Sequence, residues 1–306
     1  MTRFNTPNFC CVASVITLVY AGAFNSHARA EVVYSALRQD AWSIYFQADL
    51  TAAPRLAVEV VIGDESAPAL TPNGRRVAFE VQGAGISVCS LGAAAQCQLI
   101  RPERGTAVRP TWHPATGELL FVRYLADKTG EDSDIFTTRR ALAEMDKLIN
   151  QTGIQDYPDV SPNGRMLAYT SSQVISLHKS AVQVIQQLWV MNLETGTARQ
   201  LVMINAQDIQ PDWSPSGRQV AFASNRSGQF EIWVVNFDST GLRQVTSGPG
   251  AKTWPAWSPD GKSIMFTMVT EGHQSLRIID ADGSDLRRFE PFGPGSKIEL
   301  KDADWR

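Results

Sequence analysis

Short apolar strands alternate with turn residues along most of the chain, and one pattern of both recurs five times. The copies are APALTPNGRRVAF from Ala67, RPTWHPATGELLF from Arg109, YPDVSPNGRMLAY from Tyr157, QPDWSPSGRQVAF from Gln210 and WPAWSPDGKSIMF from Trp254. Proline sets φ at the first position of the tight turn in the middle of each copy, and glycine accepts the positive φ that follows. The pattern predicts repeated antiparallel units of strand, turn and strand.

The residues that the copies share are expected to form the structural core of each unit. They are Pro68, Pro110, Trp112, Pro158, Pro211, Trp213, Pro255, Trp257 and, in a sixth and partial copy, Trp305. The prolines are 42, 48, 53 and 44 residues apart, which suits units of four short strands. The large apolar side chain two residues after the proline is predicted to pack inward.

The two ends of the chain together complete the sixth copy. The segment KDADWR, which ends at Arg306, matches the start of a unit, and EVVYSA from Glu31 matches the apolar strand after the turn. We therefore predict an all-β, six-bladed β-propeller of four-stranded antiparallel blades, closed by pairing of the N- and C-terminal segments in one blade. The segments RRALAEMDKLI from Arg139 and KSAVQVIQQLW from Lys179 also fit short helices, but their place in the period favours strands.

Residues 1–30 differ from the repeats and have the pattern of a secretory signal peptide. Arg3 precedes an apolar run from Cys10 to Phe24, and the segment A-R-A that ends at Ala30 offers small residues for cleavage. We predict cleavage near Ala30, a propeller domain over residues 31–306 with no transmembrane segment, and a periplasmic or secreted location. An uncleaved anchor or an internal apolar strand is the alternative.

Charge and cysteine content bear on the compartment and on the partner. The chain has 28 Lys and Arg against 31 Asp and Glu and no basic stripe, so we expect no nucleic-acid partner. Cys89 and Cys97 flank a Gly-Ala turn, where a hairpin would set their side chains opposite each other, and we predict a disulfide between them. Two free thiols or half of a metal site are the alternatives.

The recurring element P-x-W-S-P-x-G-R/K-x-I/V-A-F, with strands such as EIWVVNF from Glu231, resembles the propeller repeat of the TolB family and its WD-like relatives. The resemblance covers essentially all of residues 31–306. It implies a periplasmic propeller, and because the TolB propeller contacts a lipoprotein, it implies another envelope protein as partner. TolB carries an α/β domain before its propeller, whereas this sequence enters the first propeller strand at Glu31, so we expect that domain and its role to be absent.

Patterns that indicate catalysis or metal binding are absent from the sequence. It has no G-x-S-x-G, H-x-H or H-E-x-x-H element, and Ser161, Ser214 and Ser258 recur as turn residues. We therefore expect a monomeric, protein-binding scaffold with no cofactor, no metal and no catalytic residue. A carbohydrate-binding or polysaccharide-cleaving propeller is the alternative, because similar repeats occur in sugar-cleaving lyases, and a purely structural subunit is the third hypothesis.

Two of the longer segments between strands are the candidate partner surface, because propeller loops vary in length without disturbing the blades. The residues proposed in them are Asp127, Glu131, Asp132, Asp134, His178 and Lys179. Loop variation without a function is the alternative. Exposed aromatic side chains around the axial mouth would favour a sugar ligand, whereas a rim of mixed charged and apolar residues would favour a protein.

Overall fold

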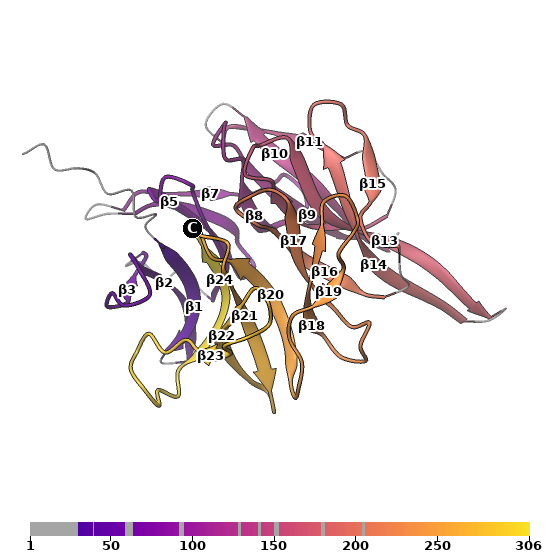
Figure 1. Ribbon diagram of the computed structural model, residues 1–306. Coiled ribbons are helices and arrows are strands. Elements are labelled where there is room, and N and C mark those ends of the chain that lie inside the picture. The colour runs from indigo at the N-terminus through magenta and orange to yellow at the C-terminus, as the bar shows by residue number, and fades with distance from the viewer. Residues whose placement is uncertain are drawn as a thin grey trace, which may run out of the picture.

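The described part of the chain consists of β-strands that form six antiparallel sheets of four (Figure 1). The structure is a computed structural model that describes residues 30–38, 40–58, 64–91, 95–127, 130–139, 142–149, 153–178, 181–203 and 206–306. The predicted signal peptide lies outside the described residues, apart from Ala30. Among the described residues, no helix is long and apolar enough to cross a membrane.

The sheets are numbered here as blades 1 to 6, and each is given from its first to its fourth strand. Blade 1 contains β24 (Glu299–Trp305), β1 (Val32–Arg38), β2 (Ala41–Gln47) and β3 (Arg55–Leu56); blade 2, β4 (Glu65–Leu70), β5 (Arg76–Val81), β6 (Gly85–Ser90) and β7 (Cys97–Ile100); blade 3, β8 (Thr106–Trp112), β9 (Leu119–Asp127), β10 (Gly130–Arg139) and β11 (Glu144–Lys147); blade 4, β12 (Gln155–Val160), β13 (Met166–His178), β14 (Ala181–Asn192) and β15 (Ala198–Gln200); blade 5, β16 (Asp208–Trp213), β17 (Gln219–Ser224), β18 (Glu231–Asn236) and β19 (Arg243–Gln244); and blade 6, β20 (Ala251–Trp257), β21 (Ser263–Thr270), β22 (His273–Asp280) and β23 (Arg287–Arg288).

The two ends of the chain meet in blade 1, as the partial sixth copy predicted. Strand β24 pairs antiparallel with β1, with Trp305 opposite Val32 and Glu299 opposite Leu37. The backbone N–H of Arg306 donates to the carbonyl of Glu31 at 2.8 Å and extends this pairing. The predicted six-bladed propeller with a shared terminal blade is therefore confirmed.

Apolar residues are packed between the blades, which explains why each blade needs its neighbours. Six buried clusters each combine two adjacent blades, and one joins the last blade to the first by packing Met265 and Leu276 against Val32 and Trp305. A four-stranded sheet with two apolar faces buries both faces only between two other sheets. The ring thus leaves no blade with an uncovered apolar face.

The repeated tryptophans belong to this core. Trp112, Trp213, Trp257 and Trp305 are between 3% and 6% exposed and lie near the ends of the first strands of their blades. Each packs in a cluster shared by two blades. The repeat therefore places its largest side chains between blades.

The described parts of the two segments that also fit short helices form strands and a turn. Strand β10 ends at Arg139 and is followed by β11, and β14 runs over Ala181–Asn192, so the prediction from the repeat period is confirmed. Strands β13 and β14 form a long hairpin that projects beyond the other blades on the right of Figure 1. The insertion in blade 4 therefore lengthens two strands of the blade.

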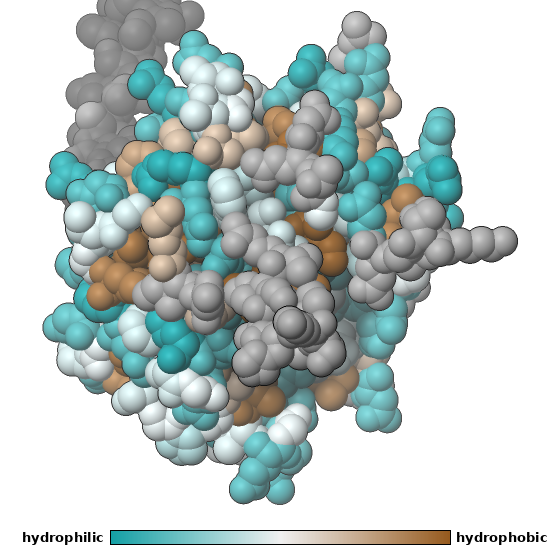
Figure 2. All heavy atoms as spheres, turned by 90° about the vertical axis from the view of Figure 1, so that its right-hand side faces the viewer, coloured by the Kyte–Doolittle hydropathy of each residue, from teal (hydrophilic) through white to brown (hydrophobic). Residues whose placement is uncertain are grey.

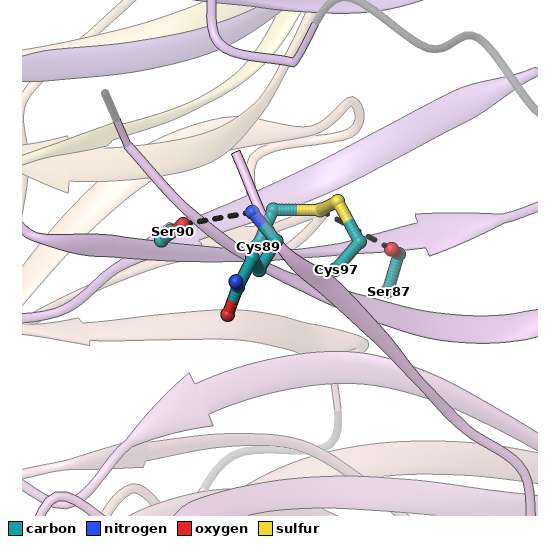
Figure 3. Close-up of a disulfide and its surroundings, with 5 residues drawn as sticks. Ser87, Cys89, Ser90 and Cys97 are labelled. Atoms are coloured by element: carbon teal, nitrogen blue, oxygen red, sulfur yellow. Dashed lines mark hydrogen bonds between the residues drawn. A yellow bond between two sulfur atoms is a disulfide. The ribbon is translucent and has the colours of Figure 1, made fainter. Parts of the chain in front are cut away.

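Cys89 and Cys97 form a disulfide between β6 and β7, the two outer strands of blade 2 (Figure 3). The two residues are directly opposite in the antiparallel register, with Cα atoms 4.1 Å apart. Cys89 is fully buried, and its sulfur lies 3.4 Å from the hydroxyl of Ser87. The bond connects the edge strand of the blade to the strand inside it.

Candidate functional site: the axial pocket

The first strands of all six blades line one cavity, which identifies the propeller axis. This axial pocket has a volume of about 90 Å³. A β-bulge interrupts each of these strands at the repeat proline or its counterpart Ala303, so the ladder shifts register there. A bulge bends the strand and redirects a side chain.

The residue before the proline is the one that the bulge redirects. It has left-handed backbone in every blade, with φ between +47° and +56°, although none of the six is glycine. All six residues line the axial pocket: Ala67, Arg109, Tyr157, Gln210, Trp254 and Asp302. The site is therefore assembled from one equivalent position in each repeat.

Charged and aromatic groups are in contact across the pocket. The guanidinium of Arg109 lies 4.4 Å from the ring centroid of Tyr157, and its Nε is 2.8 Å from Asp156. The rings of Tyr157 and Trp254 meet edge to face with centroids 5.6 Å apart. Because Tyr157 is in blade 4 and Trp254 in blade 6, this contact reaches past blade 5 and narrows the pocket.

Hydrogen bonds from backbone N–H groups to side chains hold these residues in place. The carboxylate of Glu80 accepts the N–H of Arg109 at 2.7 Å, and the side chain of Gln210 accepts the N–H of Trp254 at 2.9 Å. The N–H of Asp302 donates to the hydroxyl of Thr267 at 3.0 Å. Each bond satisfies a donor that the bulge removes from the ladder, so the left-handed residues are fixed from a neighbouring strand or blade.

A second layer of carboxylates lies deeper along the axis, one residue after the proline position. Asp159, Asp212 and Asp304 each accept a backbone N–H of the following blade, at 2.7, 2.7 and 2.6 Å. The guanidinium of Arg306 lies among them, with Nε 2.9 Å from Asp304 and Nη2 3.9 Å from Asp159. Arg306 therefore connects the closing blade with blade 4 across the axis.

Three carboxylates share one guanidinium, and this affects their protonation. Burial, aided by the negative charge of Asp304, raises the pKa of Asp159 to about 6 even though Arg306 opposes the shift. Burial and the Asp159 carboxylate raise the pKa of Asp212 well above its ordinary value. Burial acts to lower the pKa of Arg306, but the Asp304 and Asp159 carboxylates outweigh it and raise that pKa.

The opposite side of the axis is apolar. A cavity of about 260 Å³ is lined by the repeated tryptophans, by the turn prolines Pro72, Pro114, Pro162, Pro215 and Pro259, and by Arg306. Arg306 also lines the axial pocket, so its side chain separates the two cavities. The two mouths of the axis thus differ, one being charged and aromatic and the other apolar.

The predicted partner segments are mostly strands. Asp127 ends β9, whereas Glu131, Asp132 and Asp134 lie in β10. Asp132 is exposed, but Asp134 is 3% exposed and forms ion pairs with Arg123 and Lys147 at 3.1 and 2.5 Å. The carboxylate of Asp134 thus stabilises blade 3 from within.

His178 is the last residue of β13, and Lys179 lies outside the described residues. Exposed large apolar side chains elsewhere are scattered: Leu56, Leu99, Val184, Met203 and Leu286. On the face shown in Figure 2, small hydrophobic patches likewise alternate with hydrophilic residues. The described part of the chain contains no group of three or more His, Cys, Asp or Glu side chains suited to a metal ion.

Sequence reasoning missed the axial residues, although a signal for them is present. The prolines and tryptophans around them recur because the blade requires them, whereas the residue before the proline is different in every copy. A position that changes among otherwise similar repeats is not set by the repeat fold. This contrast singles out the ring of six residues.

Comparison with known proteins agrees with the repeat. Residues 182–295 match the family model of the TolB β-propeller domain. Over this part of the chain, which is less than half of its length, the sequence is similar to the TolB β-propeller domain. None of the curated proteins matches it in sequence.

Solved structures extend the TolB-type likeness to the whole fold. TolB from Acinetobacter baumannii is 16% identical with a TM-score of 0.72, over 90% of this chain and 66% of that one. A protein assigned as TolB from Agrobacterium tumefaciens is 16% identical with a TM-score of 0.63, over 91% and 98%. An oligogalacturonate lyase in complex with manganese is 12% identical with a TM-score of 0.59, over 85% and 73%. At these identities the likeness concerns the fold.

Proposed function

We propose that this TolB-type propeller is an exported scaffold that binds a protein partner of the cell envelope at the mouth of its axial pocket. The observation that carries the proposal is the ring of six different side chains at one repeat position, held in left-handed backbone toward a common cavity. Strained backbone of this kind is concentrated at functional sites. The ring combines charged, amide and aromatic groups, as hot spots of protein interfaces do.

The arrangement of the aromatic pair favours a protein over a sugar. One face of Tyr157 is covered by the Arg109 guanidinium, and its ring meets Trp254 edge to face. A sugar ring stacks on an open aromatic face, which this contact does not leave on that side of Tyr157. The aromatic residues at the axial mouth nevertheless keep carbohydrate binding as the second candidate.

Export is supported by two features. The first 30 residues have a charged start, an apolar run and a small-residue end, which is the pattern of a secretory signal. The Cys89–Cys97 disulfide suits an oxidising compartment such as the periplasm.

The proposal is tested by quantitative affinity capture from envelope extract, followed by titration of the captured partner in purified form. Wild-type protein and Met203→Ala, whose side chain is 85% exposed and outside the axial pocket, should bind it equally. Trp254→Ala should weaken binding about 30-fold, as expected for a hot spot. Equal binding by Trp254→Ala, or turnover of a polysaccharide without any protein partner, would contradict the proposal.

A further inference from the structure

A larger cavity of about 390 Å³ lies beside the axial pocket, between blades 1, 2 and 3. We call it the side cleft, and the residues of its wall that matter here are Trp42, Asp64, Glu65, Glu80 and Lys301. It adjoins the axial pocket because Glu80 accepts the N–H of Arg109 and Lys301 lies 3.7 Å from Asp302.

Glu65 is the unusual group in this wall. It is 1% exposed, and its Oε2 accepts the backbone N–H of Ile44 at 3.1 Å. Its other carboxylate oxygen, Oε1, is buried and has no hydrogen-bond partner among the described residues. A buried carboxylate with an unpaired oxygen is costly, because the charge loses its hydration without compensation.

Equivalent positions in other blades show how the fold compensates such a group. Glu65, Asp208 and Lys252 each lie three residues before the repeat proline and are at most 2% exposed. Asp208 is paired with Arg226 at 2.6 Å, and Lys252 is paired with Glu231 at 2.9 Å. At both positions the buried charge has a partner of opposite sign: Asp208 is neutralised by Arg226, and Lys252 itself neutralises the carboxylate of Glu231.

The junction of blades 1 and 2 differs in this respect. Among the described residues, no Lys, Arg or His forms an ion pair with Glu65. The same position of the repeat therefore has a buried carboxylate without its cation, and a cavity opens beside it.

The other side chains of the cleft favour a positively charged ligand. Three carboxylates, of Asp64, Glu65 and Glu80, and one ammonium group, that of Lys301, line the cleft, and Glu80 also interacts with the Arg109 guanidinium outside it. That ammonium lies 4.3 Å from the ring centroid of Trp42, a cation–π contact that places an aromatic face in this wall. The acidic groups are not clustered as a metal ion requires, so an extended organic cation fits the cleft better.

We propose that the side cleft binds an organic cation, a primary ammonium or guanidinium group, with the Glu65 carboxylate as its counter-ion. A lysine or arginine side chain of a polypeptide and a free polyamine both carry such a group. The proposal rests on the side cleft alone and does not require a partner at the axial mouth.

The test is a titration of isotope-labelled protein, residues 31–306, followed by the indole N–H signal of Trp42. N-acetyl-lysinamide and N-acetyl-argininamide represent a polypeptide side chain, spermidine represents a free polyamine, and N-acetyl-norleucinamide is the uncharged control. At least one cation should shift the Trp42 signal with saturation, and the uncharged control should not. If N-acetyl-lysinamide or N-acetyl-argininamide binds more tightly than spermidine, the natural ligand is a polypeptide side chain; if spermidine binds more tightly, it is a free polyamine. No shift with any cation, or an equal shift with the control, would overturn the proposal.

Two variants test whether the cation binds at Glu65. Glu65→Gln keeps the shape of the side chain and removes its charge. It should weaken binding of the cation at least about tenfold, because the charge-assisted hydrogen bond between the ligand and the carboxylate is lost. Glu194→Gln, an exposed residue of the turn after β14, should leave binding unchanged. Equal affinity of a folded Glu65→Gln protein would refute the role of Glu65.

A second measurement needs no variant. Burial raises the pKa of Glu65 to about 7, so raising the pH from 5.5 to 8.5 removes its proton while the lysine analogue stays charged. The other charged residues that line the side cleft are Asp64, Glu80 and Lys301, and the Arg109 guanidinium interacts with Glu80. Affinity of wild-type protein for N-acetyl-lysinamide should rise several-fold over this range. An affinity that is flat or falls with pH would contradict the proposal.

Discussion

The main feature at the residue scale is the left-handed backbone of the six non-glycine residues that line the axial pocket, one in each blade. This conformation costs about 1–2 kcal/mol for each residue that carries a Cβ. It persists because the bulge at the proline and the hydrogen bonds to the backbone N–H groups of Arg109, Trp254 and Asp302 leave the chain little alternative. In return, the strain directs six side chains to the axis.

The repeated tryptophans should contribute strongly to stability. Trp213→Ala should lower the free energy of unfolding by about 3–5 kcal/mol, because the side chain is 3% exposed and leaves a cavity between blades 4 and 5. Met203→Ala, at an exposed position, is the matched control and should change it by less than about 0.5 kcal/mol. Urea unfolding followed by circular dichroism measures both, and a loss below 1 kcal/mol for Trp213→Ala would mean that the indole is not part of the core.

The carboxylates of the axis should make stability depend on pH in an unusual direction. The pKa of Asp159 is raised to about 6 from 3.8, so between these pH values the folded chain binds more protons than the unfolded chain. Stability from this group is therefore lost as the pH rises from about 4 to about 6. Asp159→Asn keeps an acceptor for the N–H of Trp213 and removes the titration.

The pH dependence is checked by urea unfolding of both proteins at about pH 4, 5, 6, 7, 8 and 9. Wild-type stability should fall with pH more steeply than that of Asp159→Asn between pH 4 and 6, and the two should run parallel above pH 7. Equal slopes for the two proteins would show that the pKa of Asp159 is not shifted by folding, and a steeper fall in the variant would show that it is lowered; either result would contradict the prediction.

At the scale of elements, the sequence predicted the inner strands better than the outer ones. The turn S-P-x-G and the apolar strand after it are local signals, and β17 and β21 follow them as expected. Strands β3, β19 and β23 have only two residues each, and no pattern of alternation marks so short a strand. Whether such a short edge strand forms depends on the neighbouring strand of the blade with which it pairs.

The disulfide should stabilise the outer edge of blade 2. Replacing Cys89 and Cys97 together by Ala should lower the free energy of unfolding by about 2–3 kcal/mol, because a short loop of the unfolded chain is released. Wild-type protein with a reducing agent should behave similarly, whereas the variant should not respond to the reducing agent. Thermal unfolding measures the difference, and equal melting of oxidised and reduced wild-type protein would contradict this role.

At the scale of the whole molecule, stability depends on the closure of the ring. Strand β24 provides the first strand of blade 1, Trp305 fills the contact with blade 6, and Arg306 reaches the carboxylates across the axis. The pairing of β24 with β1 joins segments from opposite ends of the chain, and Trp305 and Arg306 add contacts with blades 6 and 4. Their loss would uncover apolar faces of blades 1 and 6 together.

Removing residues 302–306 should therefore lower the melting temperature by about 10 °C or more, since a loss of about 4 kcal/mol shifts a chain of this size by that amount. Calorimetry measures the transition. The control is Asp285→Asn, because Asp285 is exposed and takes no part in the pairing of β24 with β1. This variant should melt like the wild type. An unchanged melt after the truncation would mean that β24 is dispensable for the ring.

The sequence by itself determined the number of blades, the turns, the buried tryptophans and the sharing of one blade by both ends. These depend on local patterns of proline, glycine and apolar residues, which repeat because every blade meets the same physical requirement. Only the tertiary structure decided that Arg109, Tyr157, Gln210, Trp254 and Asp302 meet at one cavity and that Glu65 is buried with one carboxylate oxygen unpaired among the described residues. Those properties arise from bulges and from contacts between blades, where residues more than 40 positions apart in the sequence come together.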